Sequence, residues 1–118
     1  MSSIDENDMT VAEGLEFEAP DDTAIYLMSD IFSALADSTR LKILCYLAKN
    51  DMNVGSLVEA LNTTQPAVSH QLRLLRESGL VSVRRQGQNM IYSFADEHVR
   101  TLITVGLEHA SEKDIDHD

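Results

Sequence analysis

Hydrophobic side chains recur at helical spacing in the first part of the chain. Residues 25–35 carry apolar side chains three or four positions apart, and the acidic pair at 21–22 stands where a helix start favours carboxylates. An Asp-Ser pair at 37–38 interrupts this pattern and offers a capping side chain for a second helix. That helix has its apolar positions within 41–47 and is expected to end near 49–51.

A short helix, a tight turn and a longer helix are predicted next. The segment 54–61 gathers its large apolar side chains on one face, and the polar residues 62–64 form a turn. Pro66 stands in the first turn of the following helix, where a missing backbone N–H has no partner to lose. Gly79 ends this helix, as expected of a glycine after a C-cap.

A strand pattern replaces helical spacing after this glycine. Residues 80–85 and 89–94 are rich in β-branched and aromatic side chains, and Gln86-Gly87-Gln88 lies between them, which predicts a hairpin. A last amphipathic helix is expected to begin at Asp96 and to end at about Ser111. Together these elements predict a mainly α-helical fold with a small β-hairpin, arranged as a winged helix-turn-helix.

The formal charge is concentrated at the two ends of the chain. The 118 residues carry a net charge of -11, but residues 23–111 contain as many basic as acidic side chains. We therefore expect a disordered acidic tail over 1–20, a single domain with its dimerisation helices over 21–112, and an acidic C-terminal tail over 113–118.

Composition narrows the protein class further. The chain has one cysteine, so it cannot form an internal disulfide framework. It has no long apolar run that would cross a membrane, and its polar, acidic N-terminus does not resemble a signal peptide. A cytoplasmic location is expected.

The field around the predicted hairpin is positive in spite of the net charge. Four arginines stand against one acidic residue between positions 70 and 88, and local charge is what attracts a phosphate backbone. A helix in the major groove needs hydrogen-bonding side chains near its N-terminus, and a hairpin tip needs groups for phosphates or the minor groove. The predicted DNA-binding residues are Thr64, Gln65, Ser69, His70, Arg73, Arg84, Arg85, Gln86 and Gln88.

Two other interpretations of these residues stay open. Any one of the arginines, taken alone, is compatible with an ordinary solvated surface. His70 is equally compatible with packing between helices. The order of turn, proline-led helix, glycine stop and basic hairpin is what favours a DNA-reading unit.

The last helix carries a second candidate site, made of two imidazoles and two carboxylates. This is a ligand set suited to tetrahedral Zn(II) or Co(II), from Asp96, His98, His109 and Glu112. The two histidines face the same way, but they stand roughly 16 Å apart along the helix axis, so they cannot share an ion within one chain.

An antiparallel pair of copies removes this difficulty. In an antiparallel pair of helices, residues at the same level have position numbers with a constant sum. The pair of His98 with His109 of the partner subunit and the pair of Asp96 with Glu112 of the partner subunit have nearly the same sum, so all four side chains lie at nearly the same level. Two equivalent sites per dimer are predicted. Leu102 and Val105 form an apolar seam between the two sites, and Gly106 allows the two helices to approach each other closely.

The stretches ALADSTRLKILCYL and TQPAVSHQLRLLRESGLVSVRRQGQNMIYSF resemble the ArsR/SmtB family of bacterial metal-responsive repressors. The resemblance covers about residues 24–112. It implies a homodimer that binds a palindromic double-stranded operator, places each recognition helix in one half-site, and releases the DNA when an inducer binds.

The resemblance also bears on the metal. Zinc-sensing members have a carboxylate-x-His pair and a His-x-x-Glu or His-x-x-His pair on this helix, and residues 96–98 and 109–112 match both. The cysteine pair of other members has no counterpart at 51–54, and Cys45 is expected in the core. The sequence thus predicts a repressor of metal efflux or resistance genes that Zn(II) induces, with Co(II) and Ni(II) as alternative ions.

Three other functions are alternatives to this prediction. A regulator of the same family can respond to a signal that is not a metal, and a metal-storage protein would not bind DNA. An enzyme is not expected, because the sequence shows no activated nucleophile, no phosphate-binding glycine loop and no buried carboxylate pair. A catalytic zinc would also need an open coordination position, which four protein ligands do not leave.

Overall fold

The computed structural model describes residues 18–117, with side chains described as far as residue 113. The predicted acidic tail over 1–20 therefore falls almost entirely outside the described residues. The elements follow the predicted order: α2 (Asp22–Leu35), α3 (Ser38–Lys49), β1 (Met52–Asn53), α4 (Val54–Leu61), α5 (Gln65–Glu77), β2 (Val81–Gln86), β3 (Asn89–Phe94) and α6 (Glu97–His117).

Polar side chains start the helices at the predicted places. The Asp21 carboxylate accepts a hydrogen bond from the backbone N–H of Ala24 at 2.9 Å, and the Asp37 carboxylate accepts one from Arg40 at 3.0 Å. Each of these bonds satisfies a backbone donor that has no partner inside its helix. Asp37 rather than Ser38 is thus the cap of α3.

The chain leaves α5 through a left-handed glycine. Gly79 has φ +73°, which a side chain would disfavour, and its N–H donates to the Arg76 carbonyl at 3.0 Å. The next N–H, from Leu80, reaches back to the Leu75 carbonyl at 2.9 Å. This pair of bonds is a Schellman motif, and it turns the chain directly into β2.

The sheet has one more strand than the sequence predicts. β2 and β3 form the expected antiparallel hairpin, with Val81 opposite Phe94 and Gln86 opposite Asn89. The two residues of β1 pair with β3, so the strand order is β1-β3-β2. Two residues are too few to show a period of two, which explains why the sequence pattern did not predict β1.

The core lies around α3, which packs against α2, α4, α5, α6 and β3. Its fully buried members are Ile43, Leu44 and Leu47, and α5 contributes a second buried row of Val68, Leu72 and Leu75. Each such side chain stabilises the fold by about 1.5–3 kcal/mol relative to exposure. The inner face of the helix that is expected to read DNA therefore packs against α3, α4 and β2.

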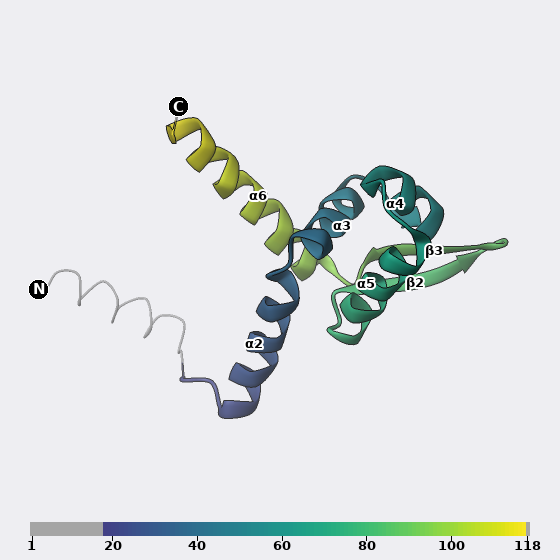
Figure 1. Cartoon of the computed structure of the whole chain (residues 1–118). Coiled ribbons are helices and arrows are strands. Elements are labelled where there is room, and N and C mark those ends of the chain that lie inside the picture. Colours follow the sequence, from purple (N-terminus) through teal and green to yellow (C-terminus); the bar gives the residue numbers. More distant parts are fainter. Residues whose placement is uncertain (1–17, 118) are drawn as a thin grey trace, which may run out of the picture.

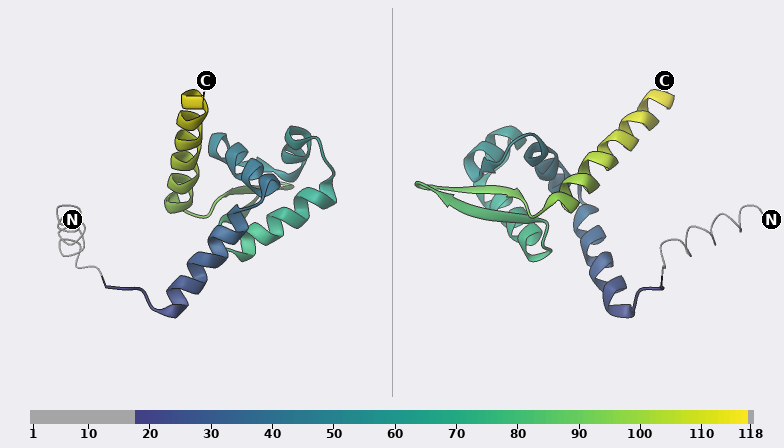
Figure 2. Two further views of the ribbon diagram at one scale, coloured as in Figure 1. Left: turned by 60° about the vertical axis from the view of Figure 1, so that its left-hand side comes forward. Right: turned by 180° about the vertical axis from the view of Figure 1, so that it is seen from behind.

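Two helices extend away from this core. Figures 1 and 2 show α2 and α6 leaving the compact part in different directions, while the β2–β3 hairpin extends from the other side. The two helices expose large apolar side chains, which are Ile25, Tyr26, Leu27, Met28 and Phe32 on α2 and Leu102, Val105 and Leu107 on α6.

α6 is longer than predicted. It continues to His117 rather than ending near Ser111. The sequence predicts an acidic tail over 113–118 because of its charge, yet the backbone there remains helical as far as His117. Within residues 18–117, no helix combines the length and the apolar character that crossing a bilayer requires.

Candidate nucleic-acid interface and metal-ligating residues

The α4–α5 pair presents one polar helix face to solvent. The Thr64 hydroxyl accepts the backbone N–H of Ala67 at 3.3 Å and so begins α5, with Pro66 in the first turn. The buried row described above holds the inner side of the helix. The predicted DNA-reading residues Gln65, Ser69, His70 and Arg73 are all exposed on the other side.

His70 and Arg73 interact with each other rather than with the core. The Arg73 guanidinium donates from Nη2 to Nδ1 of His70 at 3.0 Å. The other ring nitrogen, Nε2, has no hydrogen-bond partner among the described residues. Arg73 Nε also lies 4.0 Å from the Glu77 carboxylate, a contact that is exposed and therefore weak. The alternative that His70 packs between helices does not hold, because its side chain is exposed.

The two hairpin arginines differ in their surroundings. They are consecutive on β2, so their side chains leave opposite faces of the sheet. Arg84 forms an ion pair with Asp51, with 2.9 Å between Nη1 and Oδ2. Arg85 is exposed and has no ion-pair partner among residues 18–113. A phosphate thus meets an unengaged cation at Arg85, whereas at Arg84 it has to compete with a carboxylate.

The hairpin tip is a two-residue turn between Gln86 and Asn89. Gly87 is the first turn residue and has φ +65°, a backbone geometry in which glycine is favoured. Gln86 and Gln88 are exposed on either side of it. Both amides are accessible at the far end of the wing, as the sequence predicts.

Sequence reasoning missed a contact that positions α5. Arg40 on α3 donates from Nε to the Ala34 carbonyl at 2.7 Å and from Nη1 to the Gln71 side chain at 3.0 Å. One guanidinium therefore links the C-terminal end of α2 to α5. The sequence offers no indication of this contact, since Arg40 and Gln71 lie 31 positions apart.

Asp96 and His98 lie together at the start of α6. Asp96 is the helix cap, because its Oδ1 accepts the backbone N–H of Val99 at 3.1 Å. The same oxygen lies 3.6 Å from Nδ1 of His98, and the His98 side chain is 97% exposed. The second carboxylate oxygen and the imidazole nitrogens are consequently accessible to an ion.

His109 and Glu112 are exposed on the same helix three to four turns later. Within residues 18–113 of one chain, no three His, Cys, Asp or Glu side chains lie close enough to hold a metal ion. The four predicted ligands thus remain two separate pairs in a single protomer. Between the pairs, Thr101, Leu102 and Val105 line a shallow apolar depression together with His98.

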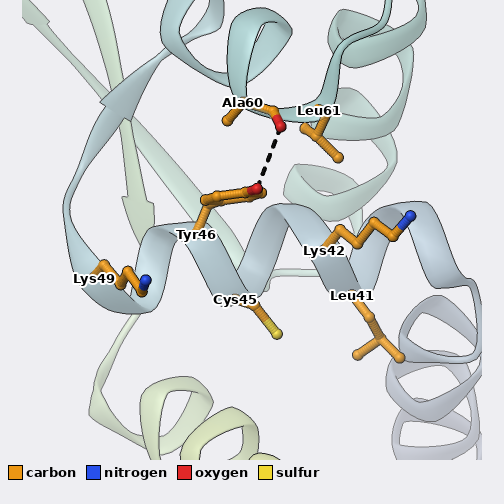
Figure 3. A pocket seen from close by; sticks show the side chains of 7 residues that line it. All are labelled: Leu41, Lys42, Cys45, Tyr46, Lys49, Ala60 and Leu61. Atoms are coloured by element: carbon orange, nitrogen blue, oxygen red, sulfur yellow. Dashed lines mark hydrogen bonds between the residues drawn. The ribbon is translucent and has the colours of Figure 1, made fainter.

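Cys45 is half-buried rather than fully buried, and burial raises the pKa of its thiol above the ordinary value. It lines a groove between α3 and α4, where the Tyr46 hydroxyl donates to the Ala60 carbonyl at 3.3 Å. Figure 3 shows Lys42 and Lys49 at opposite ends of this groove. Among the described residues, the thiol belongs to no group of three or more side chains that could hold a metal ion.

Comparisons with known proteins agree with this architecture. Residues 37–83 match the profile of the bacterial regulatory protein, arsR family. The chain is 45% identical over 87 residues to a transcriptional repressor SmtB homolog of Synechocystis, a match that covers 74% of this chain and 66% of the relative. It is 40% identical over 90 residues to the HTH-type transcriptional regulator NmtR of Mycobacterium tuberculosis, covering 76% of this chain and 75% of the relative.

Other relatives and solved structures extend the picture. The transcriptional activator HlyU of Vibrio cholerae is 37% identical over 73 residues, covering 62% of this chain and 68% of that protein. The solution structure of apo-NmtR superposes with a TM-score of 0.68 at 39% identity, covering 81% of this chain and 82% of the other.

A homodimeric winged helix-turn-helix DNA-binding domain from Mycobacterium bovis superposes with a TM-score of 0.73 at 28% identity, covering 81% of this chain and 92% of the other. The predicted fold and the absence of an enzymatic role both agree with these relatives. The chain therefore belongs to the bacterial arsR family, and it is a winged helix-turn-helix transcriptional regulator that binds DNA.

Proposed function

We propose that the protein is a cytoplasmic homodimeric repressor that leaves its palindromic operator when Zn(II) binds between the α6 helices of two protomers. Co(II) and Ni(II) are alternative ions, and metal efflux or resistance genes are the proposed targets. The supporting observation is the arrangement on α6, where an exposed carboxylate–imidazole pair at residues 96–98 is followed by a second exposed pair at 109–112.

The exposed apolar side chains support a dimer built on these helices. Leu102 and Val105 are 41% and 56% exposed, and they lie between the two ligand pairs on α6. A row of this kind is suited to an isologous contact in which the helix meets its own copy. In the antiparallel arrangement, each site combines residues 96 and 98 of one protomer with His109 and Glu112 of the partner subunit.

The donor set fits a zinc ion. Two imidazoles and two carboxylates are borderline ligands that complete a tetrahedral shell without water. Asp96 keeps one carboxylate oxygen available while the other caps the helix, and His98 is almost fully exposed. When bound, the ion would add a fixed bridge between protomers, and it needs the histidines in their neutral form.

Contacts near the ligands offer a route from α6 to the DNA-reading helix. Arg100 donates to the Ala48 carbonyl of α3 at 3.2 Å, and its guanidinium stands 4.9 Å from the centre of the Phe94 ring. A shift of α6 would thus act on α3 and on the end of the wing. A ligand changes an equilibrium only by its preference for one state, and couplings of about 1–3 kcal/mol are typical.

Zinc titration of a protein–DNA complex tests the proposal. The duplex is one selected by the metal-free protein from a randomised pool, and binding is followed by fluorescence anisotropy. We expect zinc to weaken wild-type binding by about 5- to 150-fold. His98→Ala and His109→Ala should bind the same duplex without zinc and ignore the ion.

Glu108→Gln is the matched control for these variants. Glu108 is an exposed carboxylate next to His109 that belongs to neither ligand pair, so this variant should keep the zinc response. Wild-type affinity that stays constant through the titration would contradict the metal proposal. The protein would then be a regulator of the same family with a different inducer, and His98→Ala would leave its regulation unchanged.

A further inference from the structure

We propose that a polar recess beside α5 binds a phosphate of the DNA backbone, with the Lys42 ammonium as its cation. The recess borders the helix face already assigned to DNA and shares only His70 with it. The proposal rests on α5 as the DNA-reading helix, and it is independent of the metal site.

The recess lies where three elements meet. Its volume is about 470 Å³, and its polar lining comes from the first half of α3, the α4–α5 turn and the exposed side of α5: Thr39, Lys42, Asn62, Thr63, His70 and Gln71. His70 is thus shared between the recess and the predicted reading face. A backbone that runs beside a major groove occupied by α5 would pass this recess.

Several donors in the recess are unused. Lys42 has no ion-pair partner among residues 18–113, and no bond from the side chains of Thr39, Asn62 or Thr63 is made to other described groups. An ammonium, two hydroxyls and an amide offer several N–H and O–H donors, and the hydrogen bonds that they donate are stronger when the acceptor is charged.

The chemistry of the lining selects an anion. No aspartate or glutamate lines the recess, so it has nothing to attract a metal ion or a basic peptide. A phosphate oxygen accepts from ammonium and hydroxyl groups alike, and such contacts fix the register of a protein on DNA without reading bases. Because the recess lies beside α5, a phosphate of the DNA backbone is the anion that would lie nearest to it.

Lys49 provides an internal comparison on the same helix. It lies seven residues after Lys42, about 10 Å further along α3. Its side chain is also exposed and without an ion-pair partner among the described residues. Lys49 lines the other end of the α3–α4 groove, as Figure 3 shows. It is not among the residues that line the recess.

The experiment measures salt dependence in the full chain. Wild-type protein, Lys42→Gln and Lys49→Gln are titrated into a fluorescein-labelled duplex selected by the wild-type protein, and into a random-sequence duplex, at about 50 to 200 mM salt. Both lysines are exposed, so circular dichroism should show the same thermal unfolding in all three proteins.

Lys42→Gln should weaken binding to both duplexes and should lower the slope of log affinity against log salt by about one for each protomer bound. Lys49→Gln should keep the wild-type slope, and Lys42→Arg should restore it. An unchanged slope in Lys42→Gln, or an equal decrease of the slope in Lys49→Gln, would overturn the proposal that the recess binds a phosphate. A selection in which the wild-type protein enriches no duplex would instead overturn DNA reading by α5, and the proposed phosphate site with it.

Discussion

Arg40 on α3 donates a hydrogen bond from Nη1 to the side-chain oxygen of Gln71 on α5, at 3.0 Å, across 31 positions of the chain. Its Nε donates in the same way to the Ala34 carbonyl at the end of α2, at 2.7 Å. A single side chain thus connects α2, a helix with an exposed apolar face, to α5, the helix proposed to read DNA. Any change in the direction of α2 would reach α5 through this guanidinium.

Removal of the Arg40 side chain should affect both stability and DNA binding. Partly buried hydrogen bonds to charged groups are worth about 1.5–3 kcal/mol, so Arg40→Ala should lower the free energy of unfolding by about that amount. Gln71→Ala should cost about 1 kcal/mol, because it leaves the bond to Ala34 in place. Urea unfolding measures both changes.

DNA binding distinguishes positioning from simple loss of stability. At a temperature where each variant is folded, Gln71→Ala should still bind DNA more weakly than wild type, because α5 loses its fixed orientation. Arg40→Lys keeps the charge but not the planar guanidinium with its two hydrogen bonds, so its affinity for DNA should also be lower than that of the wild type. Wild-type affinity in both variants would show that Arg40 only stabilises the fold.

The two roles of Asp96 can be separated by substitution. Asparagine caps a helix as well as aspartate does, so Asp96→Asn should keep the stability of the metal-free protein within about 0.5 kcal/mol. Asp96→Ala should lose about 1 kcal/mol of that stability. Both should bind zinc more weakly, as measured by competition with a chromophoric chelator. Wild-type zinc affinity in Asp96→Asn would remove this carboxylate from the proposed ligand set.

The two wing arginines should respond differently to substitution. Arg85 has no ion-pair partner among the described residues, so Arg85→Gln should weaken DNA binding and reduce its salt dependence by about one per protomer. Arg84→Gln should change the salt dependence less, because Arg84 already contacts Asp51. Asp51→Asn releases Arg84 and should tighten DNA binding. If Arg84→Gln proved the more damaging variant in anisotropy titrations, the assignment would be reversed.

Cys45 is expected to be a slow nucleophile with no part in metal binding. Burial raises the pKa of its thiol, which lowers the thiolate fraction near neutral pH. Because the pKa of the thiol is higher in the folded state than in the unfolded state, its contribution to the free energy of unfolding is fully present below the pKa of the unfolded state. This contribution is lost as pH rises through the pKa of the folded state, and therefore only in alkaline solution.

Reaction with iodoacetamide should therefore be slower in the folded protein than in the urea-unfolded chain. Cys45→Ala should keep the full zinc response in the DNA titration. Loss of that response would indicate a thiolate ligand, which the proposed site on α6 does not contain.

Local patterns were sufficient for much of the fold. The capping pair at 37–38, the polar turn at 62–64, the glycine exit at Gly79 and the turn at Gly87 each depend on a few neighbouring residues, so the sequence alone placed them correctly. The structure then selected Asp37 and Thr64 as the caps. The same holds for the exposed polar face of α5, because its inner face follows from helical spacing. The candidate ligands on α6 were identified in the same way, from residue type and spacing along one helix.

Contacts between distant segments needed the tertiary structure. The pairing of β1 with β3, the ion pair of Arg84 with Asp51, the bond from Arg40 to Gln71 and the recess around Lys42 all join residues far apart in sequence. No local period or propensity encodes such contacts, because they form only after the apolar faces have packed around α3. Sequence spacing therefore determined which side chains are presented, and packing decided which of them are engaged and which remain available to a ligand.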